Sequence, residues 1–218
     1  PDRLAFYSYA HTPWIKGNGQ RGYKEEDIPK DEEKRKLYEV GKALLSSNGY
    51  HEIGMDHFAI DSDSLFKASK EDKLHRNFMG YSHSKTQMMI GLGVSSISDT
   101  WYGFAQNVKD LDDYYQLLEW EKIPVFKGHI LSQEDLKIRK HILNLMCQFE
   151  TTWEHSENYM PEILSQLQEM ENDGLIKIEE NKLKVTKSGK PFLRNICMAF
   201  DLRLKRNAPK TQLFSMTV

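Results

Sequence analysis

The sequence has few of the features that mark secreted, membrane or metal-binding proteins. Only two cysteines occur in 218 residues, Cys147 and Cys197, and their spacing gives neither a disulfide framework nor a CxxC zinc knuckle. No apolar run reaches the length of a membrane-spanning helix, and no signal-peptide pattern is present. The 30 basic and 32 acidic residues leave no charge excess that would attract nucleic acid or a membrane. We therefore expect a soluble, cytoplasmic protein without a structural metal in this chain.

Motifs of several enzyme classes are also missing. The chain contains no HExxH, GxSxG or P-loop, which excludes the common zinc protease, acyl-transfer and ATP-hydrolysing sites. Gly91-Leu92-Gly93 resembles part of a dinucleotide fingerprint, but Ser96 takes the place of the third glycine and no helix begins there. We interpret these small residues as a place where a ligand approaches the backbone.

Strand and helix patterns alternate in the first part of the chain. Residues 3–10, 50–58 and 88–94 predict strands, and residues 31–47 and 110–121 predict helices. In the helix at 31–47, Asp31 is the expected N-cap and Asn48-Gly49 the stop. Its apolar positions, at helical spacing on one face, are Leu37, Val40, Leu44 and Leu45.

This alternation indicates parallel βαβ units, and the run at 88–94 is apolar enough to be buried on both faces of a parallel sheet. Three strands do not close a barrel. We therefore predict an α/β fold in which residues 1–128 are the C-terminal portion of a (β/α) barrel. The β-rich stretch that follows Pro1-Asp2-Arg3 without a lead-in favours a fragment of a longer chain.

The pattern changes near residue 129. Ser132 to Asp135 form a capping box before a helix, a second helix starts near Pro161 and ends at Asp173-Gly174, and a hairpin is centred on Glu179-Glu180-Asn181. A last helix is expected from Ser188 to about Leu204. This order predicts a winged-helix-like α+β domain over residues 129–218.

Polar residues gather where the predicted strands end. Because ligands bind at the carboxyl ends of parallel strands, this clustering favours a site there, although each residue alone also fits a structural role. The residues are His11, then Asp56 and His57, then Ser95, Ser96 and Ser98, with Gln106 and Asn107 beyond.

Several strings together resemble the oxygen-independent coproporphyrinogen III oxidases, in their C-terminal half only. The resemblance extends over essentially the whole chain. Its strings are YAHTPW at 9–14, IGMDHFA at 53–59, LHRNFMGY at 74–81, IGLGVSSIS at 90–98, AQN at 105–107 and RNICMAFD at 194–201.

The resemblance implies a radical S-adenosylmethionine enzyme on a (β/α) barrel. Such an enzyme oxidatively decarboxylates two propionates of coproporphyrinogen III to vinyl groups in haem biosynthesis. Its [4Fe–4S] cluster is held by a CxxxCxxC motif N-terminal to everything in this chain, so we expect the chain alone to be inactive. The full-length protein is expected to be a monomer.

The resemblance places residues with a known role in the family on individual positions of this sequence. The alanine of the YAH string and the isoleucine of VSxI contact S-adenosylmethionine in this family, and they correspond to Ala10 and Ile97. We therefore expect these two residues to lie near each other, at the carboxyl ends of neighbouring or nearby parallel strands. The substrate is a tetracarboxylate, so Arg76 is a candidate carboxylate ligand, with a structural salt bridge as the alternative. His11 and His57 are candidates for orienting the substrate or moving protons. Met79 departs from the glutamine that the family often has, which puts that polar contact in doubt.

Two other functions are compatible with the pattern. A paralogue that acts as a haem chaperone would keep the fold and lose the reaction. A nucleic-acid-binding regulator is suggested by the winged-helix order, but residues 158–174 contain four acidic residues and no basic one. Because binding to nucleic acid requires Lys or Arg against phosphates, we expect no nucleic-acid partner.

Overall fold

The computed structural model describes residues 1–12, 20–22 and 24–207. The chain forms two compact units: residues 1–67 with 201–218, and residues 68–200. The boundary predicted between residues 128 and 129 falls inside the second unit. The predicted division into a barrel portion and a winged-helix-like domain remains a prediction. Among the described residues, no helix has both the length and the apolar character needed to cross a membrane.

The first unit contains a small antiparallel sheet and one long helix. The sheet has the order β1-β3-β2, from β1 (Arg3–Ala5), β2 (Tyr50–Gly54) and β3 (His57–Ile60). The helices and turns are η1 (Gln20–Gly22), η2 (Glu25–Asp27), α1 (Asp31–Ser47) and α7 (Leu202–Arg206), and α2 (Ser64–Lys70) begins in this unit. Arg3 ties β1 to the start of α2 through two bonds to Asp63, at 2.8 and 3.0 Å.

The single strand predicted over residues 50–58 is wrong. The segment folds back on itself as the β2–β3 hairpin, whose two-residue turn is Met55-Asp56. Asp56 has φ 59°, the left-handed conformation that such tight turns require and that aspartate tolerates. The strand predicted at 3–10 is also shorter, since β1 ends at Ala5.

Helix α1 has the predicted bounds and the predicted stop at Asn48-Gly49, where Gly49 has φ 82°. Its N-cap, however, is Lys30 rather than Asp31. The apolar face is not buried: Leu37, Val40 and Leu44 are 55%, 58% and 60% exposed. Helical spacing shows which residues share a face, and it does not show that anything covers that face.

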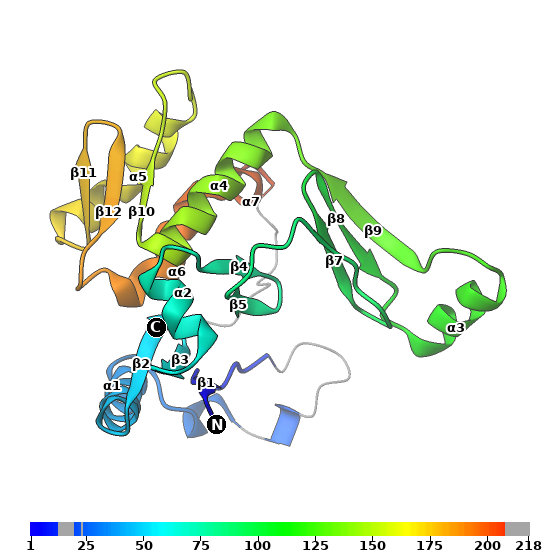
Figure 1. Ribbon diagram of the computed structural model, residues 1–218, viewed down its shortest axis with the longest axis horizontal. Helices are drawn as coiled ribbons and strands as arrows, with labels where there is room; N and C mark the ends of the chain where they lie inside the picture. The colour runs from blue at the N-terminus through cyan, green and yellow to red at the C-terminus, as the bar shows by residue number, and fades with distance from the viewer. Residues whose placement is uncertain (13–19, 23, 208–218) are drawn as a thin grey trace. The chain divides into compact units, whose positions relative to one another are not determined.

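The second unit opens with two antiparallel sheets. A hairpin joins β4 (His75–Asn77) and β5 (Gly80–Ser82), and a four-stranded sheet has the order β6-β7-β8-β9. Its strands are β6 (Met88–Met89), β7 (Ile97–Thr100), β8 (Gly103–Asn107) and β9 (Val125–Ile130). Figure 1 shows α3 (Leu111–Glu119) beyond the ends of β8 and β9, in the connection between them.

The expected parallel pairing is not observed, because every strand pair among the described residues is antiparallel. The strand predicted at 88–94 keeps only Met88–Met89. Beyond it, Ile90 and Leu92 are 68% and 87% exposed, so this run is not buried on both faces. Sequence hydrophobicity alone does not distinguish a doubly buried strand from an apolar edge segment.

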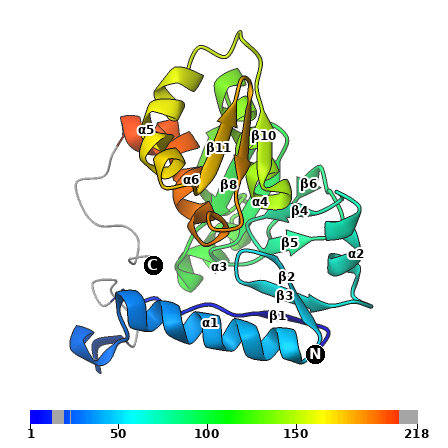
Figure 2. The ribbon, with the colours of Figure 1, turned by 90° about the vertical axis from the view of Figure 1, so that its left-hand side faces the viewer.

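The rest of the second unit is a three-stranded sheet packed with helices. It consists of α4 (Gln133–Gln148), β10 (Glu150–Thr152), α5 (Met160–Asn172), β11 (Ile176–Glu179), β12 (Lys182–Val185), η3 (Lys190–Phe192) and α6 (Leu193–Phe200). The predicted hairpin is confirmed as β11–β12, and β10, which the sequence pattern did not reveal, pairs with β12. Figure 2 shows α5 alongside β11. Fully buried core residues include Leu145, Ile163, Leu167, Leu183, Ile196 and Phe200.

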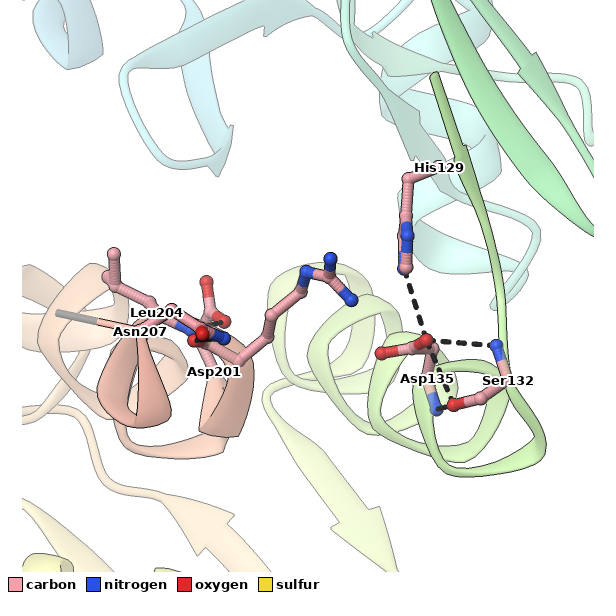
Figure 3. Close-up of polar contacts among 7 residues, drawn as sticks. His129, Ser132, Asp135, Asp201, Leu204 and Asn207 are labelled. Atoms are coloured by element: carbon pink, nitrogen blue, oxygen red, sulfur yellow. Dashed lines mark hydrogen bonds and ion pairs between the residues drawn. The ribbon is translucent and has the colours of Figure 1, made fainter. Parts of the chain in front are cut away.

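Polar caps fix the helix ends in this region. The predicted capping box is confirmed: Asp135 accepts bonds from the amide and hydroxyl of Ser132, and also contacts His129 Nε2 at 3.1 Å (Figure 3). The helix predicted from Ser188 to Leu204 is interrupted at Asp201, which has ψ 72° and caps α7 by accepting a bond from the Leu204 amide (Figure 3). An aspartate side chain that bonds the backbone stops one helix and starts the next.

Candidate functional site

The structure places the predicted site residues in two groups. Ala10, His11 and His57 lie in the first unit. Arg76 and Ile97 lie in the second unit. Ile97 is the first residue of β7 in an antiparallel sheet, so the expectation that it lies at the carboxyl end of a parallel strand is wrong. The proximity of Ala10 and Ile97 remains a prediction.

Gln20 clamps the main chain on both sides of His11. Its Oε1 accepts bonds from the Thr12 amide at 2.6 Å and the Thr12 hydroxyl at 3.2 Å, and its Nε2 donates to the Ala10 carbonyl at 2.9 Å. Within this clamp, His11 Nδ1 is buried and has no hydrogen-bond partner in the described structure. A buried ring nitrogen without a partner is costly, and so this atom is available to a ligand.

We expect Gln20→Ala to loosen the segment 10–12. Loss of these bonds should speed hydrogen exchange at the Thr12 amide about tenfold, because each bond contributes roughly 0.5–1.5 kcal/mol. Gln20→Glu is the matched control: it keeps the oxygen that accepts from Thr12 and removes the donor to Ala10. Equal exchange rates in the wild type and Gln20→Ala would show that the clamp does not order this segment.

Asp56 and His57 belong to the β2–β3 hairpin turn. His57 Nδ1 donates to the Met55 carbonyl at 2.7 Å, and the Asp56 carbonyl accepts a bond from the Phe6 amide at 2.7 Å. These bonds give both residues a structural role in joining β1, β2 and β3. They also fix the His57 ring through one of its two nitrogens.

In the second unit, the polar residues predicted to cluster around 95–107 do come together. Asn107 Nδ2 donates to the Gly93 carbonyl at 2.9 Å and to Ser96 Oγ at 3.0 Å, and lies 3.4 Å from the Gly91 carbonyl. Ser98 Oγ accepts a bond from the Gly91 amide at 3.0 Å. The network holds the segment 91–93 against β7 and β8 by its backbone.

Gly91 has a different role from the one predicted. A Cβ at this position would lie 2.8 Å from the Ile97 carbonyl oxygen, so the glycine makes room for the chain's own backbone and not for a ligand. Gly93 has φ 95° and open space where a side chain would be. Gly91 therefore positions Ile97, the residue that the family resemblance connects with S-adenosylmethionine.

Arg76 lies on the β4–β5 hairpin formed by the LHRNFMGY string. The two-residue turn is Phe78-Met79, and Asn77 Oδ1 accepts a bond from the Met79 amide at 2.9 Å. Met79 is 84% exposed at the tip of this turn. The structural salt bridge that was the alternative role of Arg76 is not present: no described carboxylate pairs with it, and its Nη1 is buried without a hydrogen-bond partner.

The two cysteines are suited neither to nucleophilic catalysis nor to metal binding. Burial raises the pKa of Cys147 to about 11 and that of Cys197 to about 12, despite an opposing effect of the Arg76 charge. Both thiols are therefore neutral near pH 7. Within the described ranges, no three His, Cys, Asp or Glu side chains gather in a way that could hold a metal ion.

Sequence reasoning did not identify Gln20 or Tyr81. Gln20 is separated by seven residues from the nearest residue that it clamps, and no local pattern predicts a bond between an amide side chain and a main chain at that distance. Tyr81 faces Arg76 across the hairpin, and the register that pairs them follows from a two-residue turn that the sequence reading did not predict. Asn77 and Gly80, which flank the turn, are residue types common in turns and could have indicated it.

Comparison with known proteins shows what the chain is similar to. It is 38% identical to the oxygen-independent coproporphyrinogen III oxidases of Escherichia coli K12 and of Synechocystis sp. PCC 6803, over 100% of this chain and 49% of each relative. The chain thus spans about half the length of these relatives, and it matches their C-terminal half. No family model matches the chain.

A solved structure is similar over nearly the same range. The coproporphyrinogen III oxidase HemN from Escherichia coli, described as a radical SAM enzyme, superimposes with a TM-score of 0.87 at 37% identity, covering 94% of this chain and 49% of that one. The resemblance stated from the sequence strings is confirmed. The mixed α/β content is confirmed with it.

Proposed function

We propose that this chain provides the C-terminal half of an oxygen-independent coproporphyrinogen III oxidase. The observation that carries the proposal is the TM-score of 0.87 with HemN, at 37% identity over 94% of the chain. The reaction would convert two propionates of coproporphyrinogen III into vinyl groups, each of which loses CO₂, one hydrogen atom and one electron. S-adenosylmethionine would supply the radical that takes the hydrogen atom, and a one-electron acceptor would take the electron. The chain's part would be to bind and orient the substrate and S-adenosylmethionine.

The domain arrangement belongs to the same proposal. Residues 1–128 would complete a (β/α) barrel that the other half of the protein begins, and residues 129–218 would form a winged-helix-like domain. Helix α5 carries Glu162, Glu169 and Glu171 and no basic residue, which supports a role other than binding nucleic acid. The complete protein would act as a monomer in the cytoplasm.

Ala10 and Ile97 would contact S-adenosylmethionine. The residues fit that group: Ala10 is small and exposed, and Ile97 is apolar and partly exposed, with its backbone held by the close approach of Gly91. Both could pack against the apolar parts of the cofactor without displacing other side chains. When bound, S-adenosylmethionine supplies the radical chemistry of the family.

The [4Fe–4S] cluster does not fit the described part of this chain. Cys147 and Cys197 are two buried or half-buried neutral thiols, and a cluster needs more thiolate ligands than these provide. Its ligands would come from a CxxxCxxC motif in the N-terminal half.

His11 and His57 would act on the substrate. The unpartnered Nδ1 of His11 is suited to donate to, or accept from, a bound ligand, while the clamp of Gln20 keeps its backbone in place. The bond from His57 Nδ1 to the Met55 carbonyl would hold the ring in a fixed orientation toward the substrate. The polar contact made by glutamine at the position of Met79 would be absent here.

A hybrid protein tests the proposed function. The N-terminal half of the Escherichia coli relative is joined to residue 1 of this chain, in place of its own C-terminal half. We expect this hybrid to restore anaerobic growth without added haem in a bacterium lacking its coproporphyrinogen III oxidases. The control carries the N-terminal half alone. A hybrid that is made in soluble form and gives no more growth than this control contradicts the proposal.

A further inference from the structure

The guanidinium of Arg76 is a positive charge that the described structure leaves without an anion. Other arginines have carboxylate partners: Arg3 pairs with Asp63 at 2.8 Å, and Arg139 pairs with Asp99 at 2.7 Å. For Arg76 no carboxylate within the described ranges is in reach, and Nη1 is buried without a partner. Arg76 as a whole is half-buried, but a buried N–H group of a charged side chain costs free energy unless an acceptor accompanies it. An anion that binds from outside would supply that acceptor.

The ring of Tyr81 supports this guanidinium. Arg76 and Tyr81 are directly opposite in the β4–β5 register, and the Arg76 Cζ lies 4.6 Å from the ring centroid. The Tyr81 hydroxyl donates to the Met146 carbonyl of α4 at 2.8 Å, so the ring is held at its far end as well. A cation over an aromatic face keeps its N–H groups available at the edge.

The surroundings of Arg76 do not neutralise it. The nearby thiols of Cys147 and Cys197 are uncharged, as described above. On the adjacent residue, burial and the charges of Lys85 and Arg139 lower the pKa of His75, against an opposing effect of Asp99. Because Asp99 is already paired with Arg139, the net field around β4 is positive. An anionic ligand is attracted by such a field.

We propose that Arg76 binds one carboxylate of the ligand and that Tyr81 is the positioning residue that holds its guanidinium in place. This inference rests on the proposed function, because the substrate named there carries four propionates. A guanidinium binds a carboxylate through two parallel N–H···O bonds, which fixes orientation as well as charge. A site of this kind recognises a carboxylate side chain of the substrate and not its tetrapyrrole ring.

The binding test uses this chain and two porphyrins. Coproporphyrin III, the stable oxidised form of the substrate, keeps four carboxylates, and its tetramethyl ester has none. In fluorescence titrations at pH 7, we expect Arg76→Gln to bind coproporphyrin III about 10- to 100-fold more weakly, as loss of a charged hydrogen-bonded pair implies. Binding of the ester should not change. Arg35→Gln, which removes a half-buried arginine of α1 paired with Glu39, is the matched control and should leave both affinities unchanged.

A double-mutant cycle tests whether Tyr81 acts on binding through Arg76. Tyr81→Leu removes the ring, and Tyr81→Phe keeps the ring and removes only the hydroxyl. We expect Tyr81→Leu to weaken coproporphyrin III binding about tenfold, Tyr81→Phe less, and the double variant Arg76→Gln/Tyr81→Leu no more than Arg76→Gln alone. Such non-additivity indicates that Tyr81 acts through Arg76, because independent structural damage would add.

Three results would overturn the inference: no coproporphyrin III binding by the unaltered chain, equal affinity in Arg76→Gln, or an equal loss for the ester. The hybrid protein distinguishes this failure from failure of the proposed function. If the hybrid converts coproporphyrinogen III and Arg76→Gln leaves its KM unchanged, the function stands and the carboxylate site is wrong. If the hybrid is inactive while the chain still binds coproporphyrin III through Arg76, the carboxylate site stands and the function is wrong.

Discussion

His141→Ala should lower the free energy of unfolding by about 3–5 kcal/mol, the range expected when a buried charge loses its partner. His141 is 2% exposed in α4. Its Nε2 lies 2.8 Å from Glu157 Oε2 and its Nδ1 lies 2.8 Å from the Thr151 hydroxyl. The histidine thus connects α4 to β10 and to the segment before α5.

The size of this effect follows from Glu157, which is 8% exposed. Burial works to raise the pKa of its carboxyl, but hydrogen bonds from Tyr159, His141 and the Glu154 amide outweigh burial and hold the pKa below the ordinary value. Glu157 is therefore an anion at neutral pH, and a carboxylate can only accept, so His141 Nε2 is the donor. Without the imidazole, a buried carboxylate loses a donor and the core gains a cavity.

Urea unfolding of the chain, followed by far-ultraviolet circular dichroism, measures this effect. His141→Gln should lose less, because the amide retains a donor. Lys140→Ala removes the exposed neighbouring side chain on the same helix and should change the unfolding free energy by no more than about 0.5 kcal/mol. A loss below about 1 kcal/mol in His141→Ala would show that the pair is not a major source of stability.

Gly91→Ala should affect both stability and cofactor binding. The added Cβ would lie 2.8 Å from the Ile97 carbonyl oxygen and 2.9 Å from its amide nitrogen, and backbone atoms cannot rotate away. Overpacking of this kind costs roughly 1–3 kcal/mol. Because the displaced residue is Ile97, we also expect the hybrid protein to bind S-adenosylmethionine about tenfold more weakly.

Gly22→Ala is the matched control, since a Cβ there meets nothing within 4 Å. Isothermal titration of the anaerobic hybrid with S-adenosylmethionine gives the affinity, and urea unfolding of the chain gives the stability. Unchanged stability in Gly91→Ala would contradict the packing argument. Reduced stability with unchanged affinity would contradict the assignment of Ile97 to the cofactor.

The sequence predicted local structure best where the residues that decide it lie close together in the chain. Helix α1 has the predicted bounds, and the capping box of Ser132 and Asp135 is present, because both depend on residues within a few positions of one another. The β11–β12 hairpin was found for the same reason. These features are decided by local hydrogen bonds and turn geometry.

The sheet topology was not predictable from those patterns. The β2–β3 turn uses Asp56 in a left-handed conformation without the Asn-Gly or Asp-Gly pair that normally indicates a hairpin, so one long strand was predicted instead. The parallel pairing expected from alternating strands and helices then followed from a wrong strand count. Burial of the apolar face of α1 depends on what packs against it, and periodicity carries no information on that.

The site was partly predictable. The strings that carry the family resemblance include Ala10, Arg76 and Ile97, whose roles in a site remain predictions. The polar cluster around Asn107 was expected from its place after the predicted strands. Tyr81 and Gln20 were missed because their roles depend on tertiary register. The expectation that Gly91 admits a ligand was wrong because the space beside it is occupied by the backbone of Ile97.

The most direct test of the central claim is the chemical fate of coproporphyrinogen III with the purified hybrid. The hybrid is reconstituted anaerobically with iron and sulfide, reduced, and supplied with S-adenosylmethionine. The products are then separated and identified by mass spectrometry. The account predicts a product in which two propionates have become vinyl groups, formed only when S-adenosylmethionine is present, and no product from this chain alone. A folded hybrid that carries its cluster and binds S-adenosylmethionine, yet leaves all four propionates intact, would contradict it.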